Sequence, residues 1–413
     1  MQARVLHTLS QRPSLTGSGI TLDALVREAA AAGWRQRAVI GVPAGDSSAV
    51  DGLGDEEVGR LEFKSDNGPA ETALDFHVPG MSDVMPYPST RFSQMTPGQL
   101  AAYRSAWRSV LSRMLGEFKP DIIHAHHAWI LSSMLKDLAR DTPVVVHGHG
   151  TALRQLVQCP HLADEIREGC RRNDLFVVLH EEHARLYREE FRLAEKQVAV
   201  VGAGYREDLF HCEGAAENRG SSILFAGKLS ESKGLRALLD AFEILRENQP
   251  GVKLHIAGGG AGEETERLLE RMKTFGEEVV YHGRVSQAEL ATLMRECSVF
   301  VLPSFFEGLA LVLIEALACG CRPVCTDLSG VRSGILPHLP GIIYTVPMPA
   351  METVDKPVKD DLPGFSRNLS QILHHALLDP PPHSGEDLRE LLFPFTWRSV
   401  YRRIETAWQR LAS

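Results

Sequence analysis

The sequence predicts an α/β protein built from two units, each a parallel sheet with helices on both faces. Short apolar runs alternate with helical stretches along the chain, most regularly between residues 222 and 331. Such alternation is typical of doubly wound parallel sheets. A chain of 413 residues is long for one compact domain, so two domains are expected.

The composition is that of an ordinary globular protein, with 44% hydrophobic and 23% charged residues. The net charge is −9 and no run is rich in lysine or arginine, which argues against nucleic acid as a partner. The first residues contain no apolar stretch of signal-peptide length, and no stretch approaches a membrane span. Seven cysteines without regular spacing indicate reduced thiols. These features together predict a cytoplasmic protein.

The chain opens like a nucleotide-binding βα unit. A strand is expected at 5–9, followed by a glycine loop, Gly17-Ser18-Gly19, and a helix. Small residues let backbone amides approach a phosphate or a sugar, although a plain tight turn explains two glycines equally well. A second strand is expected at 37–42.

The middle of the first half combines a shaped loop with histidine-bearing strands. The proline-rich segment 79–92 is expected to form a loop, and 98–118 an amphipathic helix. His124 and His126 share one face of the next strand by its two-residue period, and His147 and His149 follow on another strand. Four histidines suggest a metal, but no cysteine or carboxylate completes a ligand set at a standard spacing. We favour polar-pocket or packing histidines and expect no metal.

Polar residues follow the ends of several strands in the second half. Sites on doubly wound sheets lie beyond the carboxyl ends of the strands, so these residues are expected to line one site. They are Lys228, Lys233, Gly258, Gly259, Arg284 and Glu307. The two lysines suit a diphosphate, and the alternative is that both are ordinary surface residues. The cysteines of CGCRPVC at 319–325 are expected to be small buried residues rather than metal ligands.

The stretch 299–320 carries the most specific pattern. A buried strand runs into a turn, and a helix is expected from near Leu309 to Gly320. Glu307 and Glu315 lie eight positions apart, which on a helix is about 12 Å, roughly the length of a sugar diphosphate. The helix N-terminus between them would attract a phosphate, with one carboxylate on a sugar and the other on a ribose. The alternative is a buried strand, turn and helix with two solvated glutamates.

Taken together, these segments resemble the retaining glycosyltransferases of family GT4, which have the GT-B fold. The matching pieces are GKLSESKG, HIAGGG, VVYHGRVSQAEL and FVLPSFFEGLALVLIEALACGCRPV. The resemblance implies two Rossmann-like domains facing across a cleft. The acceptor-binding domain would span 1–205, with a C-terminal helix at 395–413 crossing back to it. The donor-binding domain would span 206–394.

The resemblance also implies roles for individual residues. Lys228 and Lys233 would bind the donor diphosphate, Glu307 would touch the donor sugar, and Glu315 would hold the ribose. His149 matches the family's active-site histidine, so His149, Glu307, Lys228 and Lys233 form the expected catalytic set. The remaining donor-binding residues implied are Gly17, Ser18, Gly19, Gly258, Arg284, Val285, Gly308, Leu309, Ala310 and Leu311.

Three departures from the family pattern stand out. Lys228 replaces the commoner arginine, which keeps the charge and loses the bidentate geometry. Ala310 stands where glycine is frequent, and SGVRS at 329–333 replaces a Gly-Gly-x-x-Glu segment. The N-terminal half further resembles N-acetylglucosaminyl-malate synthase of bacillithiol biosynthesis, in TGSGI, the loop at 86–92, IIHAH and HGT. Here HGT is followed by ALRQ rather than the usual aspartate, so malate is not assigned.

The acceptor is expected to lie against the N-terminal domain. The expected acceptor-binding residues are Tyr87, Arg91, His126, Thr151 and Arg154. The two arginines suit a small anionic acceptor, and the alternative is that both pair with nearby acids such as Asp83 or Glu165. Whether the chain forms a homo-oligomer is left open.

The resemblance implies transfer from a nucleoside diphosphate sugar, expected to be UDP-linked, with retention at the anomeric carbon. The partners are then that donor and a small-molecule or glycan acceptor. No Asp-x-Asp motif occurs, so no cofactor or bridging metal is expected. The alternatives are a non-catalytic nucleotide-sugar-binding protein and another GT-B enzyme, such as a nucleotide-sugar epimerase or a sugar phosphorylase.

Overall fold

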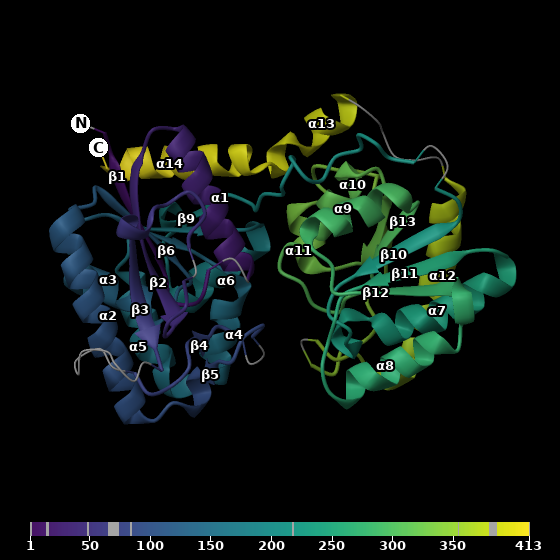
Figure 1. Cartoon of the computed structure of the whole chain (residues 1–413), viewed down its shortest axis with the longest axis horizontal. Coiled ribbons are helices and arrows are strands. Elements are labelled where there is room, and N and C mark those ends of the chain that lie inside the picture. Colours follow the sequence, from purple (N-terminus) through teal and green to yellow (C-terminus); the bar gives the residue numbers. More distant parts are fainter. Residues whose placement is uncertain are drawn as a thin grey trace. The chain divides into compact units, whose positions relative to one another are not determined.

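The computed structural model divides the chain into two compact units (Figure 1). Unit 1 comprises Met1–Gly204 together with Trp397–Ser413, and unit 2 comprises Tyr205–Thr396. The residues described are 2–13, 16–47, 49–64, 74–82, 85–216, 219–353, 355–379 and 386–412. None of the described helices is both long and apolar enough to cross a membrane.

Unit 1 is built on a seven-stranded parallel sheet of order β3-β2-β1-β6-β7-β8-β9. Its strands are β1 (Arg4–Leu9), β2 (Arg35–Pro43), β3 (Val58–Phe63), β6 (Ile122–His126), β7 (Val144–His147), β8 (Leu175–Val178) and β9 (Val198–Val200). Its helices are α1 (Gly17–Ala31), α2 (Pro97–Phe118), α3 (Ile130–Leu138), α4 (Gly150–Gln158), α5 (Pro160–Arg171), α6 (Glu181–Phe191) and α14 (Trp397–Ala412).

Both faces of this sheet are buried, as expected for a parallel sheet. Successive residues of β1 enter different cores: Leu6 packs with residues of α2 and α3, whereas Val5 packs with residues of α1 and α14. The apolar stripe of the last helix is therefore buried in unit 1, with Trp408 fully buried. The proline-rich segment also differs from a plain loop, because β4 (Pro79–Gly80) and β5 (Thr90–Arg91) form a short parallel ladder.

Unit 2 is built on a six-stranded parallel sheet of order β12-β11-β10-β13-β14-β15. Its strands are β10 (Ser222–Ala226), β11 (Lys253–Ala257), β12 (Val279–Gly283), β13 (Val299–Leu302), β14 (Arg322–Thr326) and β15 (Tyr344–Val346). Its helices are α7 (Leu235–Asn248), α8 (Glu263–Lys273), α9 (Gln287–Glu296), α10 (Val312–Ala318), α11 (Ser329–Gly334), α12 (Leu362–Leu378) and α13 (Glu386–Leu392). The predicted α/β class and the doubly wound parallel sheets are confirmed.

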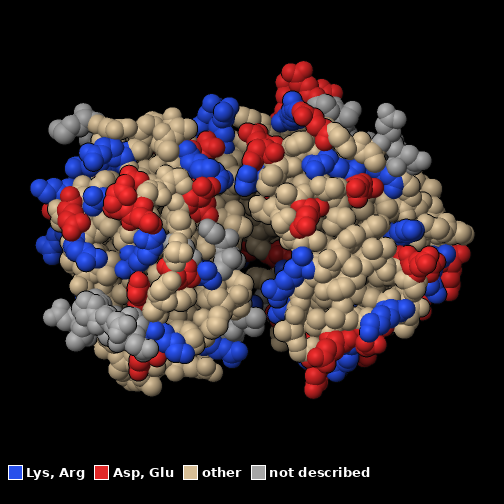
Figure 2. Space-filling model, viewed as in Figure 1, with Lys and Arg blue, Asp and Glu red and all other residues tan. Residues whose placement is uncertain are grey.

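Charged side chains of both signs are mixed on the face that Figure 2 shows, and the cysteines at 319–325 are buried. Cys319, Cys321 and Cys325 are buried and reduced, and the Cys321 thiol lies 2.9 Å from the carbonyl oxygen of Met294. Among the described residues, no cysteine belongs to a group with metal-ligating geometry.

Candidate active site

The polar residues predicted in unit 2 lie at one edge of its sheet. Strands β12, β11, β10 and β13 are neighbours and all parallel, so their carboxyl ends share that edge. Arg284 follows β12, Gly258 follows β11, Lys228 follows β10 and Glu307 lies five residues beyond β13. The fold therefore gathers on one rim residues that are far apart in the sequence, where ligands of such sheets bind.

Close backbone packing explains the glycines of this rim. Gly258 has φ +139°, and a Cβ there would lie 1.8 Å from the carbonyl oxygen of Gly227. A Cβ on Gly259 would lie 2.6 Å from Nε of Arg284. Hydrogen bonds tie the three loops together, from the Gly227 amide to Ala257 O (3.0 Å) and from the Gly258 amide to Gly283 O (2.7 Å). The rim is thus a closely packed, hydrogen-bonded backbone layer with the Arg284 side chain against Gly259.

An ion pair on the rim joins Lys233 to Glu307. The lysine Nζ lies 2.6 Å from Oε1 of the glutamate, and the side chains are 29% and 20% exposed. Lys233 ends a short 3-10 helix at Glu231–Lys233, and the Phe305 amide donates to Ser232 O at 3.0 Å. Lys228, by contrast, is exposed. The loops after β10 and β13 therefore hold one cation and one carboxylate together at the sheet edge.

The prediction that a helix begins near Leu309 is wrong, because α10 begins at Val312 and has seven residues. Ala310 has φ +49°, a left-handed conformation that breaks the helix before this point. The Leu313 amide then donates to Ala310 O at 3.0 Å. No continuous helix therefore joins Glu307 to Glu315. Glu307 lies in the loop before α10, and Glu315 lies in the first turn of that helix. Gly320, with φ +87°, lies just past the helix end, where glycine is favoured.

The glycine loop predicted in unit 1 is also wrong in detail, because Gly17, Ser18 and Gly19 form the first turn of α1. Thr16 caps this helix by accepting the Gly19 amide at 3.3 Å. Ser18 is buried, and its Oγ accepts from the side-chain nitrogen of Gln11 at 2.6 Å. A Thr N-cap followed by small residues makes this a helix N-terminus, which still offers free amides to an anion.

His149 lies in a cluster of imidazoles at the carboxyl ends of β6 and β7. It occupies the N-cap position of α4 without a capping hydrogen bond from its side chain, and its Nε2 lies 3.3 Å from Nδ1 of His126, which belongs to β6. The rings of His147 and His149 are stacked, with centroids 4.8 Å apart, and His127 lies at 4.5 Å. Burial lowers the pKa of His149 well below its usual value, and neighbouring imidazoles lower it further. The cluster is therefore neutral near pH 7.

Three of these histidines lie close enough together to hold a metal ion, because His124, His126 and His147 offer nitrogen atoms within 4.8 Å of one another. A hydrogen bond of His124 argues against this use. Nδ1 of His124 accepts the indole N–H of Trp408 at 3.0 Å. A neutral His124 then carries its proton on Nε2, which leaves no lone pair for a cation. The geometry favours the polar-pocket alternative over the metal alternative.

The residues expected to bind the acceptor differ in exposure. Tyr87 is 7% exposed and packs in the core of unit 1, where burial raises its pKa. Arg91 and Arg154 are exposed, and Thr151 Oγ1 lies 3.3 Å from Nδ1 of His127. Of the two acids named as alternative partners, Asp83 lies outside the described residues and Glu165 pairs with Arg104 at 2.7 Å.

Two family models match the chain, one in each unit. Residues 16–204 match the family described as "Glycosyl transferase 4-like domain", and residues 210–360 match "Glycosyl transferases group 1". The chain is a GT4-like glycosyltransferase.

Individual relatives are distant. Mannosylfructose-phosphate synthase of Agrobacterium fabrum is 29% identical over 164 residues, which cover 36% of each chain. Lipopolysaccharide 1,2-N-acetylglucosaminetransferase of Salmonella typhimurium is 23% identical over 291 residues, 64% of this chain and 72% of that protein. The structure of Anabaena HepE in complex with UDP and glucose superposes with a TM-score of 0.64 at 14% identity, covering 99% and 100% of the two chains. The expected GT-B fold is thereby confirmed.

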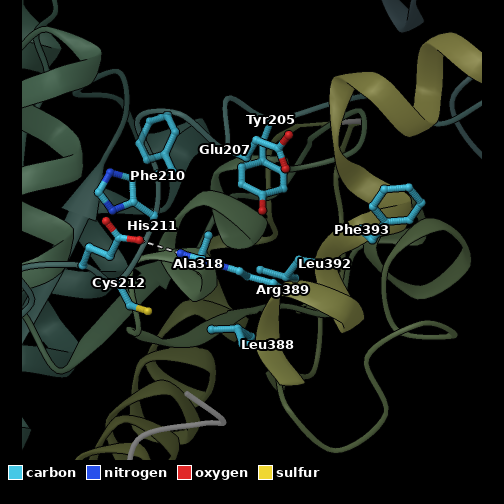
Figure 3. A pocket seen from close by; sticks show the side chains of 11 residues that line it. Tyr205, Glu207, Phe210, His211, Cys212, Ala318, Leu388, Arg389, Leu392 and Phe393 are labelled. Atoms are coloured by element: carbon cyan, nitrogen blue, oxygen red, sulfur yellow. Dashed lines mark hydrogen bonds and ion pairs between the residues drawn. The ribbon is translucent and has the colours of Figure 1, made fainter. Parts of the chain in front are cut away.

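Unit 2 of this glycosyltransferase also contains a cavity that is separate from the predicted residues (Figure 3). It has a volume of about 340 Å³ and is lined by the segment after Tyr205, by Ala318 and by α13. Glu213 and Arg389 form an ion pair in it at 2.6 Å, drawn as a dashed line in Figure 3. None of its lining residues belongs to the predicted donor or acceptor sets.

Glu315 of the glycosyltransferase gives a testable pH dependence. Burial raises the pKa of its carboxyl from 4.5 to about 7. Because this folded-state value lies above the unfolded one, the stabilising contribution is complete below pH 4.5 and is lost as the pH rises through 7. The shift corresponds to about 3 kcal/mol. We expect Glu315→Gln to raise the melting temperature relative to wild type at about pH 8.5 and to have little effect at about pH 4.

Differential scanning calorimetry of the ligand-free protein at both pH values measures this difference. Glu247→Gln, at an exposed position of α7, serves as the matched control and is expected to show no such pH dependence. Equal effects of the two substitutions at both pH values would contradict the burial of Glu315.

Sequence reasoning missed two parts of the histidine cluster. His127 was not singled out, although it adjoins His126 and its φ of +68° marks an unusual backbone position. His7, on β1, lies with its ring 6.0 Å from that of His124 and bonds Gln36 at 3.0 Å. The signal for His7 is its central place in the first strand, which parallel pairing sets beside His124.

Proposed function

We propose that this glycosyltransferase moves a sugar from a UDP-linked donor to a small anionic acceptor, with retention at the anomeric carbon. The observation that carries the proposal is the Lys233–Glu307 pair at the carboxyl edge of the unit 2 sheet. A cation there neutralises a departing diphosphate, and a carboxylate beside it accepts hydrogen bonds from sugar hydroxyls.

Chemistry at such a site consists mainly of leaving-group stabilisation. Lys233 and Lys228 supply positive charge, and the turn at Ala310 and Leu311 supplies backbone amides before α10. Glu315, one turn into that helix, takes the ribose hydroxyls. The acceptor attacks from the face that the diphosphate leaves, and the diphosphate receives the acceptor proton. The sequence offers no Asp-x-Asp motif, so the lysines take the part that a bridging cation plays elsewhere.

Arg91 and Arg154 support the anionic acceptor. Both lie exposed in unit 1, on β5 and α4, and guanidinium groups bind carboxylates and phosphates through paired hydrogen bonds. Mannosylfructose-phosphate synthase, by its name, makes a phosphorylated product, whereas the Salmonella relative, by its name, acts on lipopolysaccharide. The resemblance of the N-terminal half to the malate-using enzyme favours the small acid.

The test is a product assay with UDP-, GDP- and ADP-sugars against hydroxy acids, sugar phosphates, neutral sugars and lipid acceptors. We expect UDP release to depend on an anionic acceptor, and proton coupling at the product's anomeric centre to show retention. Arg91→Ala and Arg154→Ala are expected to raise acceptor KM about tenfold or more, as loss of a charged hydrogen bond does. Arg113→Ala, exposed on α2, is the matched control.

Three results would overturn parts of the proposal. A preference for neutral or lipid acceptors, with both arginine variants fully active, would contradict the proposal that the acceptor is anionic. Donor hydrolysis with no acceptor turnover points to a nucleotide-sugar-binding protein. A product with inverted configuration at the anomeric carbon would contradict the retaining mechanism.

A further inference from the structure

A line of buried nitrogen contacts runs through unit 1 from the last helix to the histidine cluster. The indole N–H of Trp408, on α14, donates to Nδ1 of His124 at 3.0 Å. Nε2 of His124 lies 3.3 Å from Nδ1 of His147. All three side chains are at most 1% exposed. These contacts connect α14 to His147 at the end of β7. His147 lies two residues before His149, and the two rings are stacked.

Indole fixes the direction of these hydrogen bonds, because its nitrogen can only donate. Burial lowers the pKa of His124 well below its usual value and that of His147 to about 4, so both rings are neutral near pH 7. Since Nδ1 of His124 accepts, its single proton lies on Nε2, which donates to Nδ1 of His147. The proton of His147 must then lie on its own Nε2.

A second contact fixes His149 by a similar argument. Nδ1 of His126 lies 3.3 Å from Nε2 of His149, and Nε2 of His126 is buried without a hydrogen-bond partner among the described residues. A buried N–H without a partner is rarer than an unused acceptor. The proton of His126 therefore lies on Nδ1 and is donated to His149, which carries its own proton on Nδ1.

Packing couples the two contacts. The rings of His126 and His147 are stacked at 9°, and His147 is stacked on His149 at 14°. The other titratable groups that face the cluster are His7 from β1, His127 after β6 and His183 from α6, and the pKa of each is lowered by burial. Tyr187 of α6 holds the His149 carbonyl at 3.0 Å. Of the imidazoles in these contacts, only His149 keeps appreciable exposure.

We propose that His126 and Trp408 are positioning residues for His149, of which His126 fixes its tautomer and Trp408 helps to fix its ring plane. His126 acts on it directly, whereas Trp408 acts through His124 and through His147, the ring on which His149 is stacked. The result is a neutral imidazole that presents a fixed Nδ1–H to a hydroxyl of the transferred sugar. This last step rests on the proposed function, whereas the assignment of the tautomers does not.

The tautomers can be read without substrate. We expect long-range proton–nitrogen correlation spectra of the full chain, labelled with 15N-histidine, to show His124 and His147 protonated on Nε2. His126 and His149 are expected to be protonated on Nδ1, with all four neutral across the neutral pH range. An imidazolium signal in this range, or a His149 proton on Nε2, would overturn the proposal. A shift of His124 and His147 with one equivalent of Zn²⁺ would overturn it in favour of a metal site.

Variants then separate positioning from packing. Trp408→Phe keeps an aromatic ring and removes the N–H, and it should convert the His147 signal to a mixture of tautomers. Trp107→Phe, at an equally buried tryptophan of α2, is the matched control and should leave the imidazole signals unchanged. Imidazole signals that do not change in Trp408→Phe would contradict the proposed line of contacts.

Activity gives a second, independent readout. Asparagine places an amide N–H near the position of histidine Nδ1, so His126→Asn should lower kcat less than His126→Leu, for which we expect a loss of about tenfold at unchanged donor KM. Equal losses in both variants would reduce His126 to a packing residue. If wild type has the expected tautomers but no transferase activity, the proposed function fails and the tautomer assignment stands.

Discussion

Replacing Lys233 with alanine is expected to lower kcat by about 100-fold or more, the usual loss on removal of one preorganised charge contact. Lys233 is the cation that the structure holds against a carboxylate at the sheet edge, 2.6 Å from Glu307. Its removal takes away charge facing the departing diphosphate. It also leaves Glu307, which is 20% exposed, as an unpaired anion beside that charge. Steady-state kinetics with saturating donor measures the loss.

Lys273→Ala provides the matched control for this substitution. Lys273 is 71% exposed at the end of α8 and pairs with Glu270, so its loss should leave kcat unchanged. EDTA should have little effect on either protein, because the proposed mechanism assigns no step to a cation. Full activity of Lys233→Ala, or activity abolished by EDTA and restored by Mg²⁺ or Mn²⁺, would refute the assignment.

Replacing Gly234 with alanine is expected to destabilise unit 2 by about 3 kcal/mol or more. Gly234 follows Lys233 with φ +69°, and a Cβ there would lie 1.9 Å from the carbonyl oxygen of Pro303. The left-handed conformation costs about 1–2 kcal/mol for alanine, and forced repacking adds about 1–3 kcal/mol. For a unit of this size, we expect the melting transition to fall by roughly 6–12 °C in calorimetry.

Gly116→Ala makes the same chemical change without the clash. Gly116 lies inside α2, and a Cβ there would meet no atom within 4 Å. Alanine is favoured over glycine in a helix by up to about 1 kcal/mol, so this variant should melt at or above the wild-type temperature. Similar melting of the two variants would contradict the close approach of Gly234 to Pro303.

The sequence predicted the fold well because the fold depends on local patterns. The apolar runs that became β10, β11 and β13 each end in small or polar residues, and parallel pairing then places these ends together. The start of α10 was misplaced because the run after Glu307 is apolar throughout, and periodicity does not reveal the left-handed Ala310. Two glycines in three residues predict a loop where the structure has the first turn of α1, which the Thr16 side chain caps.

The histidine cluster marks the limit of such reasoning. His124 and His126 were placed on one strand face from the two-residue period alone. The contact of His124 with Trp408 joins residues 284 positions apart, and no local pattern encodes it. The sequence predicts Trp408 only as part of an apolar stripe, because periodicity reports which helix face is apolar and not which partner an indole N–H finds.

Because α14 belongs to unit 1, the two units can complete their folding only in a certain order during synthesis at the ribosome. Unit 2 is one uninterrupted segment, Tyr205–Thr396, whereas unit 1 needs Trp397–Ser413 as well as the first 204 residues. On the nascent N-terminal sheet, the surface around Val5 and Ile122 packs against α1 but lacks the contacts of α14 until that helix is made. Domains usually fold in the order in which they are made, and here the second can finish before the first. A stop codon just before Trp397 would leave unit 2 whole. Unit 1 would lack α14, and we expect it to be bound by chaperones or degraded by proteases.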